Sequence, residues 1–421
     1  MRMNLWNETK PLPITKEQVW AAWKKVRDNS GSYGIDKVSI DMVDADPAKY
    51  LYPVWNRLSS GSYFPPAVRE KGIPKDVGKV RYLGIPTVCD RVAQMVIREE
   101  LELILEPQFS EHSYAYRPKR SAHDAVETCK QNCKRFKWAI DLDIQGFFDN
   151  IDWGLMIRAL RHFTNTNYHI MYVKRWLKAS LIKEDGSLVE RTKGTPQGGV
   201  ISPLLANLFL HVVFDKWFEK RFPELKYERY ADDVIVHCHS EKQAKYVLDM
   251  IGKRMGECKL NLHPDKTKIV YCKRNYKKKL PYRPKHVSFD FLGFTFRPRM
   301  VKTKRGKFIL EFRPGISIKS RTKILAAIRK TNFHRWSNAT LSKLGKLSCF
   351  QSIRGWINYY GKFRKSDLQN VFRLLNIRLM KWAKNKYKRF KRSYRLARIW
   401  LREVAISKPD LFEHWRHGWI P

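Results

Sequence analysis

The chain has 421 residues, of which 43% are hydrophobic and 13% aromatic, and this excludes both wholesale disorder and a small disulfide-stapled scaffold. Its 83 Lys and Arg residues outnumber 40 Asp and Glu residues, and the formal net charge of +43 indicates a polyanionic partner, with nucleic acid the first candidate. The seven cysteines contain no C-x-x-C pair, which argues against a zinc finger of the usual spacing.

The sequence shows no stretch that is long and apolar enough to span a membrane. The longest nearly apolar run, Val200 to Phe214, is interrupted by polar residues and a proline. The first ten residues, MRMNLWNETK, lack the apolar core of a signal peptide. These features predict a cytoplasmic protein without a membrane partner.

The first chemically informative segment is an acidic strand at residues 138–144. Alternation along a strand places Asp141 and Asp143 on one face, opposite the apolar residues between them. The tight segment QGFFDN follows directly. Asp143 is the candidate metal ligand, and Asp141, Asp149 and Asp152 are alternatives to it.

A glycine-rich segment, GTPQGGVISP at residues 194–203, predicts a turn before a helix. Ser202 and Pro203 fit the N-cap and the first helical position, and Pro223 would end the helix near Phe222. The glycines would let a base pair or a sugar lie against the backbone. Such turns are common before helices, so this one alone does not identify a site.

The sharpest local signal is Tyr230-Ala231-Asp232-Asp233, which directly precedes the β-prone run VIV. Two adjacent carboxylates repel each other unless a cation neutralises them, and hard oxygen ligands favour Mg²⁺. A solvated hairpin turn is the alternative. If the strand at 138–144 lies beside this one, three carboxylates can hold two metals about 3.5–4 Å apart, as in-line phosphoryl transfer requires.

The C-terminal part changes from strands to helices. Residues 289–296 and 307–312 read as strands joined across Gly306, and helical periodicity begins after Pro314. Helices at 318–331, at 341–360 and after Ser366-Asp367 predict a bundle of about three members, with a domain boundary near 297–315. From residue 297 onward, the chain has 33 basic and 5 acidic residues, a net charge of +28.

Basic and aromatic residues are mixed through this C-terminal part, a combination suited to phosphates and unpaired bases. Trp356 and Trp382 fall on apolar helix faces, which predicts that both pack in the core. The candidate RNA-binding residues are therefore the cations: Arg354, Lys362, Arg364, Lys386, Lys388 and Arg389.

In this order the motifs resemble the reverse transcriptase and maturase proteins of bacterial group II introns. The resemblance covers nearly the whole chain, and its later motifs include DIQGFFDNI, GTPQGGVISPLLANL, RYADD, LNLHPDKTKIV, FDFLGF and IRGWINYY. Its earlier motifs are NSGSYGID (Asn29 to Asp36), IPKDVGKVRYLGIPTVCDRV (Ile73 to Val92) and HSYAYRPKRSAHDA (His112 to Ala125). The departures are Ala115 and Lys119, where the family usually has glycine, and they put fine template contacts in doubt.

The resemblance implies a role for each matching residue. Asp143, Asp232 and Asp233 would be the catalytic metal ligands, with the backbone carbonyl of Ile144 as an extra ligand. Phe148 would block a ribose 2′-hydroxyl, and Gln197 would pass under the nascent base pair. The residues near the incoming triphosphate would be Lys75, Arg81 and Lys266. The primer-grip turn would be Leu292, Gly293 and Phe294.

The implied fold class is α+β, a right-hand polymerase with fingers and palm followed by an α-helical thumb or maturase domain. We expect an N-terminal extension and the start of the fingers at 1–72, the reverse transcriptase domain at 73–296 and the RNA-binding thumb at 297–421.

The implied function is RNA-directed DNA polymerisation, together with binding of a group II intron RNA to promote its splicing and its mobility by target-primed reverse transcription. The cofactor would be Mg²⁺, two ions per active site, for which Mn²⁺ can substitute. The partners would be the intron RNA, an RNA template with a DNA primer, target DNA and deoxynucleoside triphosphates, in the bacterial cytoplasm. The sequence leaves the oligomeric state open.

Two alternatives stay open from sequence. One is an RNA-binding splicing maturase whose polymerase site is vestigial, and the other is a host-adopted reverse transcriptase in defence or repair. Many family members continue into an H-N-H endonuclease with Cys-x-x-Cys pairs. Here no cysteine follows Cys349, and His414 and His417 lack such partners. We therefore expect the endonuclease-lacking type, which would not cut the second target strand.

Overall fold

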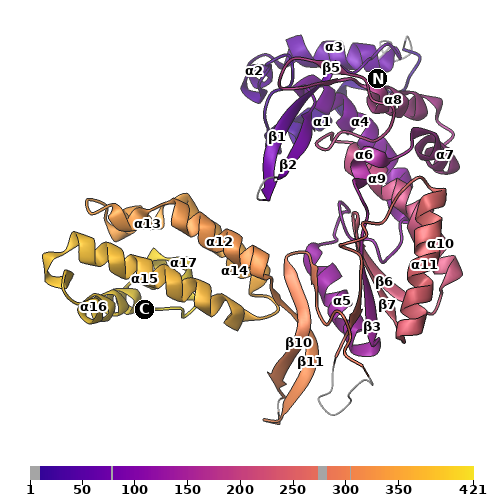
Figure 1. The fold of residues 1–421 in the computed structure, drawn as a ribbon. Coiled ribbons are helices and arrows are strands. Elements are labelled where there is room, and N and C mark those ends of the chain that lie inside the picture. The colour runs from indigo at the N-terminus through magenta and orange to yellow at the C-terminus, as the bar shows by residue number, and fades with distance from the viewer. Residues whose placement is uncertain (1–9, 77–78, 274–281, 304) are drawn as a thin grey trace, which may run out of the picture. The chain divides into compact units, whose positions relative to one another are not determined.

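The computed structural model describes residues 10–76, 79–273, 282–303 and 305–421 (Figure 1). The chain divides into two compact units, each assembled from separate stretches of sequence. The first unit comprises Met1–Ala125, Ile140–Val236 and Glu241–Lys268. The second comprises Val126–Ala139, His237–Ser240 and Ile269–Pro421.

The N-terminal helices of the first unit pack on one long helix. Thr15 begins the first of them with a capping box. Its side chain accepts from the Gln18 N–H, and the Gln18 side chain accepts from the Thr15 N–H. Trp23, on the same helix, is fully buried. These helices are α1 (Lys16–Asp28), α2 (Ile40–Ala45), α3 (Pro47–Ser59) and α4 (Val88–Leu105).

A four-stranded sheet extends from these helices, in the order β2-β1-β4-β5. Its two long strands form an antiparallel hairpin in which Ile73 pairs with Arg81 and Gly72 with Tyr82. A Cβ added at Gly72 would lie 3.0 Å from Val80 Cγ1, so the absence of a side chain there leaves room for Val80. The strands are β1 (Val68–Asp76), β2 (Lys79–Ile85), β4 (Leu181–Ile182) and β5 (Leu188–Val189).

A second four-stranded sheet, in the order β6-β7-β3-β8, carries the acidic motifs. The predicted adjacency is confirmed, because the strand that ends at Asp143 pairs with the strand that begins at Asp233. Asp141 and Asp143 are more exposed than their apolar neighbours, as alternation predicts. The strands are β3 (Trp138–Asp143), β6 (Lys226–Tyr230), β7 (Asp233–Cys238) and β8 (Lys268–Tyr271).

The helix predicted after the glycine-rich segment spans residues 202–221. It consists of α9 (Ser202–Leu210), a π-helical turn η2 (His211–Asp215) and α10 (Lys216–Arg221). Figure 1 shows α10 beside α11, and Arg254 of α11 donates to the Val213 carbonyl.

The predicted cap of this helix is wrong by one residue. The N-cap is Ile201, whose N–H donates to the Gln94 side chain. Ser202 instead pairs its hydroxyl with Thr195 at 2.8 Å. A tertiary hydrogen bond therefore replaces the local cap.

Further helices complete this part of the chain. Asp152 caps α7 by accepting the Leu155 N–H. The elements are η1 (Glu106–Gln108), α5 (Ala122–Arg135), α6 (Phe147–Asn150), α7 (Trp153–Phe163), α8 (Asn167–Lys178) and α11 (Glu241–Glu257).

The C-terminal stretch of the second unit contains a three-stranded sheet in the order β11-β10-β9. The strand expected at 289–296 is instead two strands, because Leu292 and Gly293 turn the chain between them. The strand expected at 307–312 is confirmed, and Gly306, at φ +78°, lies in the predicted turn before it. Stacked rings of Phe289 and Phe296 cover one face, with centroids 4.8 Å apart. The strands are β9 (Phe289–Phe291), β10 (Phe294–Lys302) and β11 (Phe308–Ile316).

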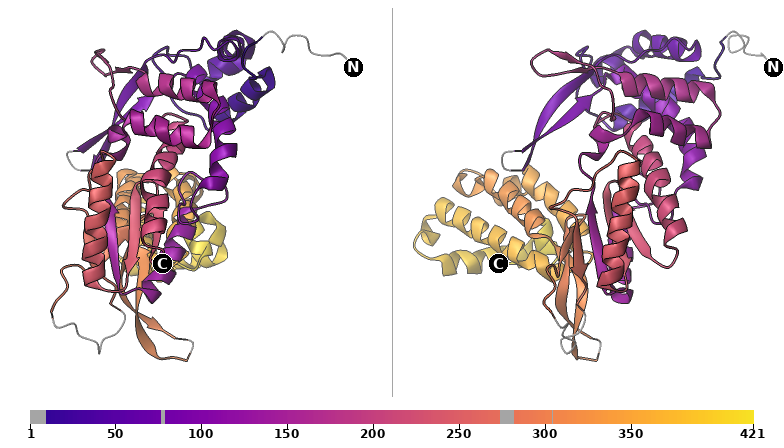
Figure 2. Two further views of the ribbon diagram at one scale, coloured as in Figure 1. Left: turned by 90° about the vertical axis from the view of Figure 1, so that its right-hand side faces the viewer. Right: turned by 45° about the vertical axis from the view of Figure 1, so that its right-hand side comes forward.

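Helices α12 to α17 gather into one bundle at the end of the chain (Figure 2). The expected three members are too few: the segment at 341–360 is split into two helices, and α16 and α17 were missed. The helix expected after Ser366-Asp367 begins at Gln369 behind the short turn η4. The helices are α12 (Ile318–Lys330), α13 (Leu341–Gly345), α14 (Ser348–Tyr360), α15 (Gln369–Lys386), α16 (Tyr394–Ser407) and α17 (Glu413–Arg416).

One aromatic-rich core holds this bundle together, and Trp382 lies fully buried within it, as predicted. The Trp382 indole donates to the Trp336 carbonyl at 3.0 Å, so its one polar group is satisfied. Trp356 is partly buried against the same core. Short 3₁₀ turns link the helices: η3 (Phe333–Arg335), η4 (Lys365–Leu368), η5 (Lys388–Phe390) and η6 (Pro409–Leu411).

Among the described residues, no helix combines the length and the apolar composition that a bilayer crossing demands.

Candidate active site

A pocket of about 630 Å³ in the first unit brings the acidic motifs together. Asp143 reaches it from the end of β3, and Asp232 and Asp233 reach it from the turn between β6 and β7. Their chain neighbours and residues from three further segments complete the lining: Glu70, Val80, Arg81, Tyr82, Ile144, Gln145, Gly146, Phe147, Phe148, Asp149, Gln197, His263 and Lys266. The three carboxylates that sequence singled out therefore face one cavity.

The segment after α11 fixes the position of Asp143. The His263 N–H donates to the Asp143 carbonyl at 2.7 Å, and Ile144 forms an antiparallel bridge with Leu262. Lys266, on the same segment, places its ammonium 2.9 Å from the Asp143 carboxylate. The side chains of this pair are 52% and 31% exposed, so water screens their attraction.

The turn that carries Asp232 and Asp233 has an unusual backbone. Ala231 adopts φ +56°, in the left-handed region that residues other than glycine rarely occupy. Its side chain is only 7% exposed, whereas Asp233 is exposed and Asp232 is half-buried. The conformation thus turns the chain within two residues and presents both carboxylates to the pocket.

The glycine-rich turn is anchored on β2 by a close approach of two backbones. Gly198 has φ +125°, and a Cβ added there would lie 2.6 Å from the Gly84 carbonyl oxygen. The Gly84 N–H donates to the Gln197 carbonyl at 2.8 Å. The Gln197 side chain then accepts from Arg81 Nε at 2.7 Å. Two of the predicted nucleotide-binding residues are therefore in direct contact.

Phe148 forms part of the pocket wall and is 9% exposed. Gly146, at φ +55°, allows the chain to turn from β3 into α6, the short helix that carries Phe148. The Thr195 N–H donates to the Phe148 carbonyl at 2.8 Å and holds this backbone. The backbone that carries the ring is consequently tied to the glycine-rich segment.

Three acidic residues were alternatives to Asp143, and the structure separates them. Asp149 lines the pocket and Asp141 does not. Asp152 lies 2.7 Å from Lys259, whose hydrogen bond lowers the pKa of the Asp152 carboxyl. The Asp152 carboxylate also accepts the Leu155 N–H as the N-cap of α7, so its oxygens already have structural partners. Of the three, Asp149 is the one whose position in the pocket is compatible with metal binding.

One predicted nucleotide-binding residue cannot be placed in the pocket. Lys75 lies on β1, but its side chain falls outside the described part of the structure.

The predicted primer-grip turn lies between β9 and β10 in the second unit. Leu292 and Gly293 have φ values of +51° and +80°. The Leu292 carbonyl accepts from the Tyr359 hydroxyl at 2.9 Å, and the Gly293 carbonyl accepts from Ser317 N–H and from the Ser320 hydroxyl, each at 3.0 Å. The turn is therefore held by the helices that follow it.

The predicted RNA-binding residues divide into engaged and solvent-facing cations. Arg364 pairs with Asp367 at 3.1 Å, and Lys386 donates to the Ser337 carbonyl at 2.9 Å. Arg354 lies 3.6 Å from Glu413. Lys362, Lys388 and Arg389 are exposed, and Arg354 is exposed as well despite its contact with Glu413.

His414 and His417 behave as packing and surface residues. His414 is fully buried, contacts Asn376 at 2.9 Å and stacks on Phe372. Burial lowers the pKa of His414 to about 3, which keeps its imidazole neutral. His417 lies 3.6 Å from Glu413.

Sequence reasoning missed several residues of the pocket. Tyr82 and Glu70 lie on the hairpin that carries Arg81, and His263 lies three residues before Lys266. The available signal was proximity to a motif residue along the chain. Which of these neighbours would face the cavity depended on hairpin register, which sequence does not provide.

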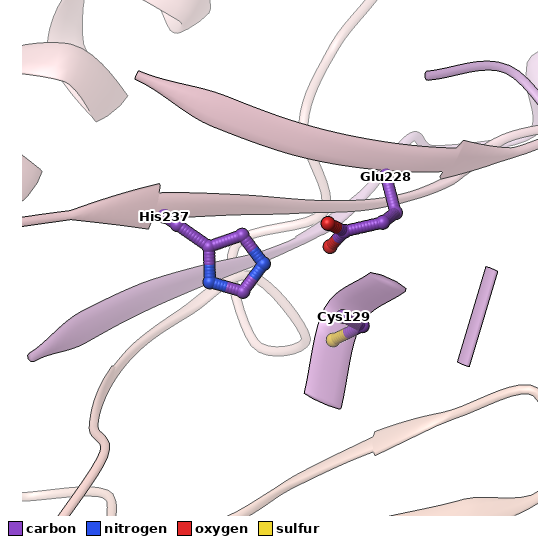
Figure 3. A group of neighbouring side chains, drawn as sticks. All are labelled: Cys129, Glu228 and His237. Carbon is purple, nitrogen blue, oxygen red and sulfur yellow. The ribbon is translucent and has the colours of Figure 1, made fainter. Parts of the chain in front are cut away.

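A separate group of buried side chains lies farther along the β6–β7 hairpin (Figure 3). Glu228 and His237, each four residues from the Asp232-Asp233 pair, have ligand atoms within 4.8 Å of each other and of Cys129. Each of the three has interaction partners within the protein. Cys129 and Cys133 are both fully buried, as the packing interpretation predicts.

Comparison with known proteins identifies the family. Residues 73–296 match the family model for reverse transcriptase (RNA-dependent DNA polymerase). The chain belongs to the reverse transcriptase family. Residues 321–400 of this reverse transcriptase also match the group II intron maturase-specific domain. The fold is accordingly that of fingers and palm followed by a helical thumb.

Two curated relatives agree with this assignment. Protein YkfC of Escherichia coli is 32% identical over 276 residues, which cover 56% of this chain and 72% of YkfC. The group II intron-encoded protein LtrA of Lactococcus lactis is 31% identical over 268 residues, covering 63% of this chain and 43% of LtrA. The chain thus spans less than half the length of LtrA.

A solved structure was also matched. Telomerase from Candida albicans shows a TM-score of 0.44 at 12% identity, covering 84% of this chain and 65% of telomerase.

Reverse transcriptases use divalent metal ions, and the pocket offers a donor set of the right kind. Three carboxylates and the adjacent backbone carbonyl of Ile144 are hard oxygen donors. No imidazole or thiolate is needed to complete such a set. The residues present therefore fit the ions that the family uses.

Proposed function

We propose that this chain copies RNA into DNA at the 630 Å³ pocket. The observation that carries the proposal is that Asp143, Asp232 and Asp233 line the same cavity as two cations, Arg81 and Lys266. Carboxylates serve to hold metal, and cations serve to hold phosphate. A nucleoside triphosphate needs both at once.

Asp143, Asp232, Asp233 and the Ile144 carbonyl would hold two Mg²⁺ ions, and Mn²⁺ can take the same oxygen ligands. When bound, these ions supply charge stabilisation for in-line attack of the primer 3′-hydroxyl on the α-phosphate, with pyrophosphate as the leaving group. The remaining tasks belong to the chain itself, namely binding and orienting the substrate and excluding the wrong sugar.

Arg81, Lys266 and Lys75 would bind the triphosphate, the arginine as a fork and the lysines as point charges. Gln197 would support the nascent base pair, and its bond to Arg81 would keep base and phosphate recognition in register. Phe148 would exclude the ribose 2′-hydroxyl, because its ring is buried in the pocket wall and its backbone carbonyl accepts from the Thr195 N–H. Leu292, Gly293 and Phe294 would grip the primer.

We further propose that the partners are a group II intron RNA, an RNA template with a DNA primer, target DNA and deoxynucleoside triphosphates. The maturase-specific match at 321–400 and the net charge of +28 from residue 297 onward support intron binding, splicing and intron mobility. Three functional segments, 1–72, 73–296 and 297–421, and a bacterial cytoplasmic location complete the proposal.

The test is primer extension on an RNA template with variants of the pocket. Asp143→Ala, Asp232→Ala or Asp233→Ala should each lower extension by about 1,000-fold or more, the equivalent of about 4 kcal/mol of transition-state stabilisation. Asp141→Ala is the matched control, because Asp141 lies on the same strand outside the pocket. Intron RNA binding should persist in all four variants.

Substantial extension by Asp232→Ala would refute the metal assignment. A splicing assay at low Mg²⁺ with the flanking intron RNA distinguishes an active polymerase from the vestigial-polymerase alternative. That alternative predicts splicing but no extension by the unmodified protein. Extension without splicing would favour a host-adopted enzyme.

A further inference from the structure

Behind the catalytic turn lies an arginine that is wholly buried. Arg229, on β6, is 0% exposed and stands three residues before Asp232. Its guanidinium forms a bidentate ion pair with Asp215, which is also 0% exposed, and Nε donates to Oδ1 at 2.8 Å. Desolvation makes such a pair a poor source of stability, since apolar residues of similar volume often serve as well. Its presence calls for a task other than stability.

Two nitrogens of the Arg229 guanidinium bind Asp215, and the third, Nη1, reaches the turn that carries Asp232 and Asp233. Arg229 Nη1 donates to the Ala231 carbonyl at 3.3 Å and to the Asn207 side-chain oxygen at 3.0 Å. Ala231 is the residue held at φ +56°, which costs an alanine about 1–2 kcal/mol. The bond from Arg229 thus falls on the peptide unit that joins Ala231 to Asp232.

The helix that supplies Asp215 is adapted to this contact. Asn207 and Asp215 are eight residues apart, which in a regular α-helix would place them about 80° apart around the axis. The π-helical turn His211–Asp215 lies between them and winds the chain less tightly, so both side chains reach Arg229. Such turns are frequent at functional sites.

The same network holds a second segment next to the carboxylates. Asn207 Nδ2 donates to the Ala115 carbonyl at 2.7 Å. The next residue, Tyr116, is also left-handed, at φ +56°, and its ring is half exposed. Burial and the nearby Asp232 raise the pKa of the Tyr116 hydroxyl, which reports its closeness to the catalytic pair.

We infer that Arg229 is a positioning residue that sets the catalytic turn through the Ala231 carbonyl and, through Asn207, keeps that turn in register with Tyr116. This inference rests on the proposed polymerase function of the pocket. Asp215 keeps the fork oriented, and the strained turn stays in place because the fork holds it. Without the fork, Ala231 would relax from the left-handed region and carry Asp232 away from Asp143.

The experiment measures three quantities for each variant of the full chain: the single-turnover rate of primer extension, the Mg²⁺ concentration at half-maximal rate, and the thermal midpoint. Arg229→Lys keeps a positive charge beside Asp215 and loses the fork. We expect a rate lowered about 10- to 100-fold, as for a displacement of about 1 Å at a reacting centre, and a severalfold higher Mg²⁺ requirement.

Rescue distinguishes positioning from a structural role. Ala231→Gly alone completes the double-mutant cycle. In the Arg229→Lys background it should restore rate and Mg²⁺ requirement several-fold, because glycine occupies the left-handed region without strain. The matched control is Arg175→Lys, since Arg175 also donates to two backbone carbonyls, Gly61 and Tyr63, far along the chain from the turn. It should leave the Mg²⁺ requirement unchanged.

A second variant tests the same inference if Arg229→Lys folds poorly. Arg229→Met with Asp215→Leu removes both buried charges together, which proteins often tolerate. It should fold, show the same loss of rate and respond to Ala231→Gly. Variants that lower the thermal midpoint but match Arg175→Lys in Mg²⁺ requirement, or that Ala231→Gly does not rescue, would overturn the inference. If the unmodified protein itself does not extend a primer, the proposed function fails instead.

Discussion

Gly198→Ala is the change that tests the construction of the nucleotide pocket most directly. Gly198 has φ +125°, and its missing Cβ would meet the Gly84 carbonyl oxygen at 2.6 Å. The backbone conformation costs a side-chain-bearing residue about 1–3 kcal/mol. The overlap cannot be relieved by a flexible side chain because the neighbour is backbone, so overpacking adds about 1–3 kcal/mol.

Substitutions at two other glycines separate the cost of backbone strain from the cost of overpacking. Gly186 has φ +85° with nothing within 4 Å of the added Cβ, so Gly186→Ala should show conformational strain alone. Gly252 lies inside α11 in open space with an ordinary helical φ, so Gly252→Ala should stabilise the protein by about 0.5–1 kcal/mol. Gly198→Ala should therefore be the most destabilising of the three, by about 2–6 kcal/mol in total.

The assay combines urea unfolding with steady-state primer extension. Relief of the overlap moves the turn away from Gly84, and the Gln197 side chain then leaves Arg81. We expect the KM for deoxynucleoside triphosphate to rise about tenfold, which corresponds to about 1.4 kcal/mol of binding. An unfolding midpoint equal to that of Gly186→Ala, with an unchanged KM, would show that the two backbones do not approach as described.

Three further predictions follow from other parts of the chain. Phe148→Val should raise ribonucleotide incorporation relative to deoxyribonucleotide incorporation about 10-fold or more in competition assays, because a steric wall penalises only the larger sugar; unchanged discrimination would place the wall elsewhere. Replacing the exposed residues Lys388, Lys391, Arg392 and Arg395 by Gln should reduce the slope of log affinity for intron RNA against log salt by about 2–3, and an unchanged slope would move the RNA-binding surface away from α16. Burial raises the pKa of Asp90 from 3.8 to about 6, so the folded state binds this proton more tightly than the unfolded state, and unfolding free energy should fall as pH rises from about 4 to about 6; Asp90→Asn should lack that component, and identical pH profiles would refute it.

Much of the fold could be predicted because local patterns and long-range packing agree. The alternation of residues 138–143 placed Asp143 on the more exposed face, and the turn residue Gly306 joined the two strands of a real hairpin. Asp143, Asp232 and Asp233 were predictable as a set because two separate strand ends carry acidic residues and both match motifs of the family that the chain resembles. Their convergence required only that β3 and β7 be neighbours, and they are.

What sequence could not provide was the set of contacts made through space. Ser202 has the sequence of an N-cap, but its hydroxyl bonds to Thr195, and the N-cap is Ile201, whose N–H donates to Gln94. Lys119, one of the two departures from the family pattern, adopts φ +59°, so the chain keeps a left-handed backbone there even without glycine. The helical bundle gained members because α16 buries only a narrow apolar face, which periodicity alone did not separate from loop.

The two electrostatic features of the chain, a net charge of +43 and a cluster of carboxylates, solve different problems. At physiological ionic strength a charge is screened within about 8 Å, so the distant lysines that attract RNA do little for a triphosphate inside the pocket. The phosphates must enter a cavity whose carboxylates repel them. Arg81 and Lys266 stand at that cavity, and Lys266 already neutralises Asp143 at 2.9 Å. We therefore expect triphosphate binding to depend on cations at the pocket itself, and surplus charge elsewhere would not replace Arg81 or Lys266.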